Sequence, residues 1–190
     1  QEIFETLNAR GTPLTAADLI KNFVFQRLGG SAKEAEKAYH QYWEEFETPF
    51  WEIEISAGRL LNSRSSLFLT QWLIAQTRAD ITAREVFSKF KVYVTERSEP
   101  VEQLLPRLKK SADNYASFTL GATRQTGSLS RLELFVYRMS TLDSEVVKPV
   151  LIYLTDADLE TIESGQLEKA LASLESWFVR RAIVRASTKR

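Results

Sequence analysis

Apolar side chains recur at helical spacing along most of the chain, and this pattern predicts a protein built from helices. Strand-like segments do not alternate with helical ones, and the chain has no internal repeat. We therefore expect an all-α fold, an irregular multi-helix bundle of seven to eight helices with little or no sheet. Beyond the first fifty residues, the expected helices lie at about residues 67–76, 86–94, 101–118, 129–139, 146–154 and 166–185.

Three pairs of residues predict where helices begin, because each has a serine or threonine followed three residues later by an acidic side chain. In such a capping box the hydroxyl accepts from a backbone amide, and the carboxylate accepts from the amide of the capping residue. The first two of these helices are expected to end at Gly29–Gly30 and at about Phe46. The pairs are Thr15 with Asp18, Ser31 with Glu34, and Thr82 with Glu85.

The segment 50–58 has a different pattern, in which apolar and acidic residues alternate. Trp51, Ile53 and Ile55 are apolar, and the residues between them are glutamates. A period of two is typical of a β-strand, but no partner strand is evident in the sequence. We favour an extended segment or a loop over the core, with a strand as the alternative. Most of the four tryptophans are expected in the core, with Trp51 the least securely buried.

The composition excludes several classes of function. The chain has 190 residues, 25 acidic and 25 basic side chains, one histidine and no cysteine. Without cysteine there is no disulfide framework, thiolate nucleophile or cysteine-ligated metal site, and one histidine excludes multi-histidine metal sites. No apolar run reaches the roughly 18 residues of a membrane helix, and there is no signal peptide. We therefore expect a cytoplasmic protein that does not associate with membranes.

Neither a catalytic centre nor a metal site is expected from the residues of this chain. His40 has no acid or nucleophile at a recognisable spacing, and we expect it at the surface or half-buried. The glutamates between Lys33 and Glu54 do not have the spacing of a calcium-binding loop, so solvent-facing positions on helices account for them.

The loop Asn8–Pro13 is a candidate phosphate site. Gly11 allows the backbone to approach a ligand, and Arg10 provides a guanidinium that can form two hydrogen bonds. Lys21 lies one turn into the following helix, near enough to contribute. The alternative is an ordinary turn that leaves Arg10 in solvent.

The C-terminal helix provides a second basic candidate. Arg180, Arg181 and Arg185 lie close together there, followed by two further basic residues. Arginine clusters of this kind are typical of contacts to a nucleic-acid backbone. The alternative is a solvated helix end whose cations complement the helix dipole. The apolar spacing of this helix predicts that Trp177 and Phe178 face inward.

Two segments of the chain resemble the GmrSD-type family of restriction endonucleases. The first is residues 3–22, IFETLNARGTPLTAADLIKN, which contains an asparagine before an arginine–glycine turn and an aspartate–leucine–isoleucine–lysine helix. The second is residues 174–183, LESWFVRRAI, which contains paired arginines. The first match is the more specific, and the sequence between the two segments contains no quotable family motif.

The resemblance implies that the parent is a nucleotide-dependent nuclease that defends bacteria against phage by cutting modified DNA. In that family a ParB/sulfiredoxin-like domain with an Asp-Gly-Gln-Gln-Arg signature precedes a helical region, and a His-Asn-His nuclease domain often follows. Neither signature occurs in this sequence. We therefore expect residues 1–30 to be the C-terminal edge of the nucleotide-binding domain and residues 31–190 to be the helical domain.

On this interpretation the chain couples nucleotide turnover to DNA recognition or cleavage and is not catalytic alone. Asn8, Arg10, Gly11 and Lys21 are then candidate nucleotide contacts. The chain begins at Gln1 inside an apolar helical pattern, which also suggests a fragment of a longer protein.

The expected cofactors of the parent are a nucleoside triphosphate and a divalent metal ion, with none bound by the fragment. Its expected partners are DNA and a nuclease domain in the same or another chain. The alternative is a non-enzymatic helical domain for protein interaction or homo-oligomerisation.

Overall fold

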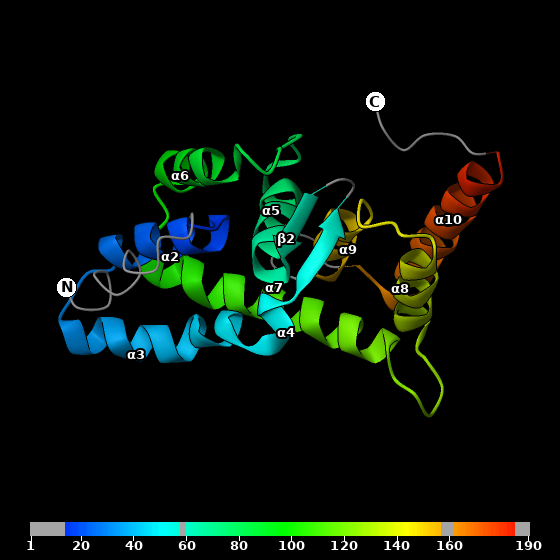
Figure 1. Cartoon of the computed structure of the whole chain (residues 1–190), viewed down its shortest axis with the longest axis horizontal. Coiled ribbons are helices and arrows are strands. Elements are labelled where there is room, and N and C mark those ends of the chain that lie inside the picture. Colours follow the sequence, from blue (N-terminus) through cyan, green and yellow to red (C-terminus); the bar gives the residue numbers. More distant parts are fainter. Residues whose placement is uncertain (1–13, 58–59, 157–161, 185–190) are drawn as a thin grey trace. The chain divides into compact units, whose positions relative to one another are not determined.

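The computed structural model of the chain describes residues 14–57, 60–156 and 162–184 (Figure 1). Apart from one two-stranded hairpin, the regular elements of these residues are helices, which confirms the expected all-α fold. Nine of them are α-helices and one is a 3₁₀ helix, so the described part of the chain has more helices than predicted. None of these helices has the length and apolar character that crossing a membrane requires.

The chain divides into two compact units, Gln1–Lys109 and Lys110–Arg190. Residue 30, where the resemblance placed a boundary, lies within the first unit. The first unit contains α2 (Ala16–Arg27), α3 (Ala32–Tyr42), η1 (Glu44–Glu47), α4 (Pro49–Glu52), β1 (Glu54–Ala57), β2 (Leu60–Ser63), α5 (Arg64–Thr77) and α6 (Val86–Arg97). The second unit contains α8 (Arg131–Thr141), α9 (Lys148–Thr155) and α10 (Ser164–Ile183), and α7 (Val101–Ala122) contributes to both.

The predicted capping residues occur where helices begin. Thr15 and Asp18 form the complete capping box of α2, and Ser31 and Glu34 form that of α3. Glu85 accepts a hydrogen bond from the Thr82 hydroxyl at 2.6 Å, but these two residues form the turn before α6, which begins one residue after Glu85. The helix from Ser31 is shorter than predicted, because α3 ends at Tyr42 and the 3₁₀ helix η1 follows.

Our preference for a loop or unpaired extended segment at residues 50–58 is wrong. The first part of this segment belongs to the short helix α4, and β1 then pairs antiparallel with β2, with Glu54 opposite Ser63 and Ile55 opposite Asn62. The alternative, a strand, is therefore correct only for the end of the alternating run, where Glu54 and Ile55 belong to β1. The partner was missed because the sequence of β2, Leu-Leu-Asn-Ser, is too short to show an alternation of its own.

Aromatic side chains dominate the core of the first unit. Trp51 has no exposed surface, and its ring centroid lies 5.0 Å from that of Phe46 and 5.2 Å from that of Phe68. Trp43 and Trp72 are also buried. The expectation that Trp51 is the least securely buried tryptophan is therefore wrong, because the helical turn of α4 directs it into the core.

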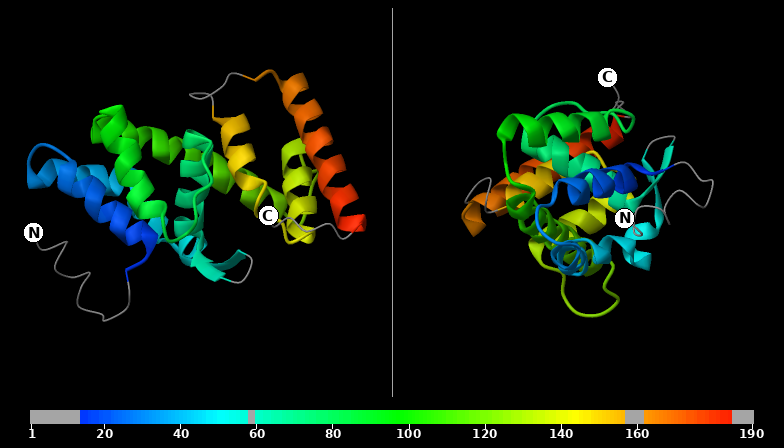
Figure 2. Two further views of the ribbon diagram at one scale, coloured as in Figure 1. Left: turned by 90° about the horizontal axis from the view of Figure 1, so that it is seen from above. Right: turned by 90° about the vertical axis from the view of Figure 1, so that its left-hand side faces the viewer.

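The second unit has a core of its own. Helices α8 and α10 pack side by side, as Figure 2 shows, and they bury Phe135, Leu171 and Phe178. Leu151 of α9 and Tyr115 of α7 are buried in the same unit. This packing leaves the opposite face of α10 accessible.

Candidate functional site

The structure describes only part of the segment 3–22, from residue 14 onward. Asn8, Arg10 and Gly11 lie outside the described residues, so the candidate loop has no structural account. The first turn of α2 is built from Thr15 and Asp18, and the Asp18 carboxylate accepts from the Thr15 amide at 2.9 Å and from its hydroxyl at 2.7 Å. Asp18 thus fixes the start of α2.

Lys21 is engaged within the first unit. The residue is 7% exposed, and its ammonium lies 2.6 Å from a carboxylate oxygen of Glu47. The Tyr39 hydroxyl donates to the other oxygen of the same carboxylate at 2.6 Å. Burial and this hydrogen bond to Glu47 raise the pKa of Tyr39, which keeps its hydroxyl a neutral donor. Nucleotide contact by Lys21 stays a prediction, and its ammonium already joins α2 to η1.

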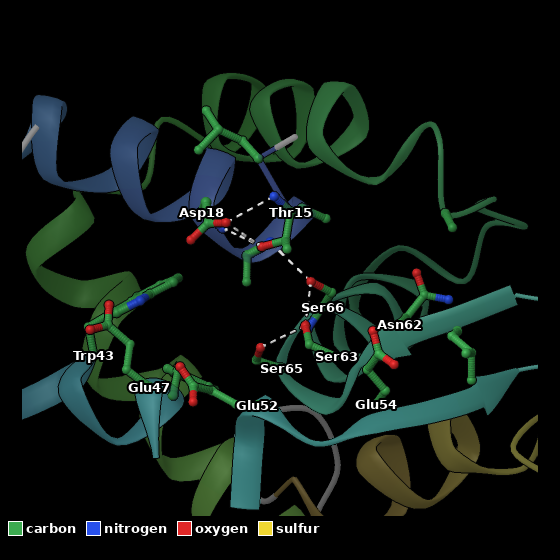
Figure 3. Close-up of a pocket in the computed structure, with 16 residues that line it drawn as sticks. Thr15, Asp18, Trp43, Glu47, Glu52, Glu54, Asn62, Ser63, Ser65 and Ser66 are labelled. Atoms are coloured by element: carbon green, nitrogen blue, oxygen red, sulfur yellow. Dashed lines mark hydrogen bonds between the residues drawn. The ribbon is translucent and has the colours of Figure 1, made fainter. Parts of the chain in front are cut away.

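A polar pocket of about 610 Å³ lies beside this ion pair (Figure 3). Glu47 and Glu52 line one side of it, and Glu54 of β1 and Asn62 of β2 line the other. The hydroxyls of Ser63, Ser65 and Ser66 also line it and hydrogen-bond to one another. Its charged lining is acidic, which does not suit a phosphate. Among the described residues no cluster of acidic or histidine side chains has the geometry of a metal site.

The C-terminal arginines lie at the accessible end of α10, except Arg185, which is outside the described residues. Arg180 is exposed, and its Nε donates to the Ser176 carbonyl one turn earlier at 3.1 Å. Arg181 is half-buried, and its guanidinium lies over the Trp177 ring, 4.7 Å from the centroid. The prediction that Trp177 faces inward is wrong, since the residue is 46% exposed, whereas Phe178 is buried as predicted. Consecutive residues point in different directions from a helix, so a helix that is covered on one side buries one of them and exposes the other.

The other arginines near α10 differ from Arg180 in their partners. Arg131 and Arg138 of α8 both pair with Glu175 of α10, and Arg131 lies 2.8 Å from its carboxylate. Arg180 has no carboxylate partner in residues 14–57, 60–156 and 162–184. The end of α10 therefore presents an arginine whose charge is not offset by a neighbouring acid, next to an exposed aromatic ring.

Neither a family model nor a curated protein nor a solved structure matches the chain. No family is therefore assigned from these comparisons, and the resemblance to the GmrSD type stays a prediction. The function has to be argued from the chain's own residues.

The second unit also contains buried polar side chains that sequence analysis did not identify. Lys148 is buried, with its ammonium 4.8 Å from the centre of the Tyr115 ring. The Ser111 hydroxyl donates to the buried Asp156 carboxylate at 3.0 Å. These contacts join α9 and the residue that follows it to α7 inside one unit, so we assign them to packing. A single polar residue within an apolar helical pattern gives no signal of such a partner.

The only histidine of the chain has no catalytic geometry. His40 is exposed, and its ring nitrogen lies 3.2 Å from a carboxylate oxygen of Glu44 on the next turn. Its surface position agrees with the prediction. An exposed pair of this kind, one turn apart, contributes little to stability.

Proposed function

We propose that this chain is the helical part of a nucleotide-dependent, DNA-targeting phage-defence protein of the GmrSD type, and that the end of α10 is its DNA-contacting surface. The chain is not catalytic alone in this proposal. The observation that carries it is the exposed Arg180, which lacks a carboxylate partner in the described part of the chain and lies on the same helix end as Trp177 and Arg181. The resemblance of the segments 3–22 and 174–183 to that family supports the same assignment.

A contact with DNA fits the chemistry of this helix end. Arginine forms two parallel hydrogen bonds to phosphate oxygens, and phosphate contacts supply much of the affinity of DNA-binding proteins. The whole chain has equal numbers of acidic and basic side chains, so its net charge does not attract DNA. Binding must therefore depend on a small local surface, and few phosphates are contacted.

The first unit offers a route for coupling to nucleotide. The helix α2 begins within the segment 3–22 and packs against α5 and α6. Its polar contacts include the Lys21–Glu47 ion pair and a hydrogen bond from the Ala17 amide to the Ser66 hydroxyl at 3.3 Å. A shift at the start of α2, caused by nucleotide in an upstream domain, would therefore move its neighbours with it.

Binding of duplex DNA across a salt series tests the proposal. The logarithm of the affinity should fall linearly with the logarithm of salt concentration, with a slope of about −0.9 per phosphate contact. Arg180→Ala should weaken binding to all sequences alike and reduce the magnitude of that slope by about one. The matched control is Lys169→Ala, which removes an exposed charge nearer the start of the same helix.

A second candidate function is protein interaction through the same helix end. Apolar side chains there are exposed: Val179, Ile183 and Val184. An interface that buries apolar surface depends only weakly on salt, because no counterions are released. No DNA binding at low salt, together with salt-insensitive association of the chain with itself, would favour this second function over the first.

A further inference from the structure

Trp177 is the exposed member of a set of otherwise buried tryptophans. Trp43, Trp51 and Trp72 belong to the core of the first unit, whereas Trp177 of α10 is 46% exposed. The guanidinium of Arg181 lies over the Trp177 ring, and the buried Phe178 meets this ring edge-on, with centroids 4.8 Å apart and planes at 89°. The exposed indole is thus held by a cation on its ring and by an anchored aromatic neighbour.

An accessible indole beside arginine is suited to unpaired bases. Every base has a flat π surface that can stack on an aromatic side chain, and this stacking does not depend strongly on sequence. In a duplex the faces of the bases are covered by their neighbours, so an intact duplex cannot place a base on Trp177. Single-stranded nucleic acid has no such restriction.

We propose, building on the DNA-contacting role above, that Trp177 and Arg180 form a binding site for single-stranded nucleic acid. Trp177 stacks on an unpaired base, Arg181 keeps the indole in place, and Arg180 binds a backbone phosphate. This surface prefers a single strand, or a strand locally opened, over an intact duplex.

The charges around the site favour an anionic occupant. Arg131 and Arg138 are already paired with Glu175, whereas Arg180 lacks an acidic partner among residues 14–57, 60–156 and 162–184. A basic peptide would be repelled by Arg180. A purely apolar partner would leave the Arg180 charge without a counter-ion when the surface is covered, which is costly.

The difference in burial between Trp177 and the other three tryptophans allows base stacking to be measured by fluorescence. Because Trp43, Trp51 and Trp72 are buried, quenching of tryptophan fluorescence by a short oligothymidine should arise from Trp177. The affinity of each variant is measured separately, by fluorescence anisotropy of a labelled oligothymidine and of a labelled duplex. Trp177→Ala should weaken single-strand binding about 5- to 150-fold. Trp177→Phe should retain most of the affinity, and the affinity for duplex should change little in both variants.

The possible results separate this inference from the proposal on which it depends. If Trp177→Ala binds oligothymidine as tightly as the unaltered chain while Arg180→Ala weakens binding, the stacking site is wrong and the DNA-contacting surface stands. If neither form of DNA binds at low salt, both are wrong. Trp177 is largely outside the core, so unchanged circular dichroism and thermal unfolding will show that the variants are folded.

Discussion

The Lys21 ammonium is buried in the first unit, and the Glu47 carboxylate is its counter-ion. It lies 2.6 Å from Glu47, and the Tyr39 hydroxyl binds the same carboxylate. The Lys21 side chain is 9% exposed and that of Glu47 is 39% exposed, so the two partners differ in their access to water. Removing the Glu47 charge should therefore destabilise the fold more than removing the Lys21 charge. A lone Glu47 carboxylate can be hydrated where it lies, whereas a lone Lys21 ammonium cannot.

Substitutions in this pair should differ in their effect on stability. Glu47→Gln leaves a buried ammonium without its counter-ion and should lower the free energy of unfolding by about 1–3 kcal/mol. Lys21→Met removes the charge but retains the length of the side chain, and should cost less than about 1 kcal/mol, because replacing a buried charge by an apolar group is often close to neutral. Urea denaturation followed by circular dichroism measures both values.

Lys169→Met is the control for this comparison, because it makes the same change at an exposed position. It should alter the free energy of unfolding by less than about 0.5 kcal/mol. If Lys21→Met destabilised the protein more than Glu47→Gln, the ammonium would be contributing net stability, and the order argued from burial would be overturned.

At the scale of single elements, three glutamates hold the backbone at the start of a helix or in the turn just before it. Glu34 accepts from the backbone and hydroxyl of Ser31, and Glu133 accepts from the backbone of Ser130 and pairs with Arg124 at 2.5 Å. Glu85 accepts from both groups of Thr82 in the same way. Hydrogen bonds from these residues lower the pKa of each glutamate, because they favour the charged carboxylate.

The lowered pKa values predict how stability changes with pH. Since each pKa is lower in the folded than in the unfolded chain, the carboxylates stabilise the fold above the unfolded value of roughly 4.3, and this contribution is lost as pH falls through the folded value. A variant with glutamine at positions 34, 85 and 133 should melt at a lower temperature than the unaltered chain at pH 7. This difference should shrink below about pH 4, as thermal unfolding across a pH series would show.

The matching control replaces three exposed glutamates that cap no helix, Glu36, Glu96 and Glu168, with glutamine. Both variants lose the same number of charges, so a general charge effect would alter their melting temperatures alike. A pH dependence shared by both variants would show that the capping hydrogen bonds are not its cause.

These elements also show what sequence could and could not predict. The boxes at Thr15 and Ser31 placed the starts of α2 and α3, because capping depends only on residues three positions apart. The hairpin and the burial of Trp51 were missed, because they depend on a partner strand and on the turn of α4. The arginines of α10 were identified from their charge, but the exposure of Trp177 was not, because helical spacing could not decide which of two adjacent aromatic residues is buried.

At the scale of the whole molecule, the two regions to which function is assigned lie in different units. The segment 3–22 belongs to the first unit, and the proposed DNA-contacting surface on α10 belongs to the second. Among the described elements, only α7 contributes residues to both. Any coupling between nucleotide and DNA that travels through the backbone of regular elements must therefore pass along α7.

Each unit has its own core, and we expect the two to differ in their resistance to unfolding. Phe135→Ala removes a fully buried ring on α8 and should destabilise the second unit by about 3–5 kcal/mol. Hydrogen exchange followed by mass spectrometry should then show faster exchange in α8 and α10, with protection in α2 and α5 retained. Tyr137→Ala, an exposed aromatic residue on the same helix, should leave the exchange of every helix nearly unchanged. Equal loss of protection in α5 and α10 would instead show that the two units unfold as one cooperative unit. A change near α2 could then affect α10 without being transmitted along α7.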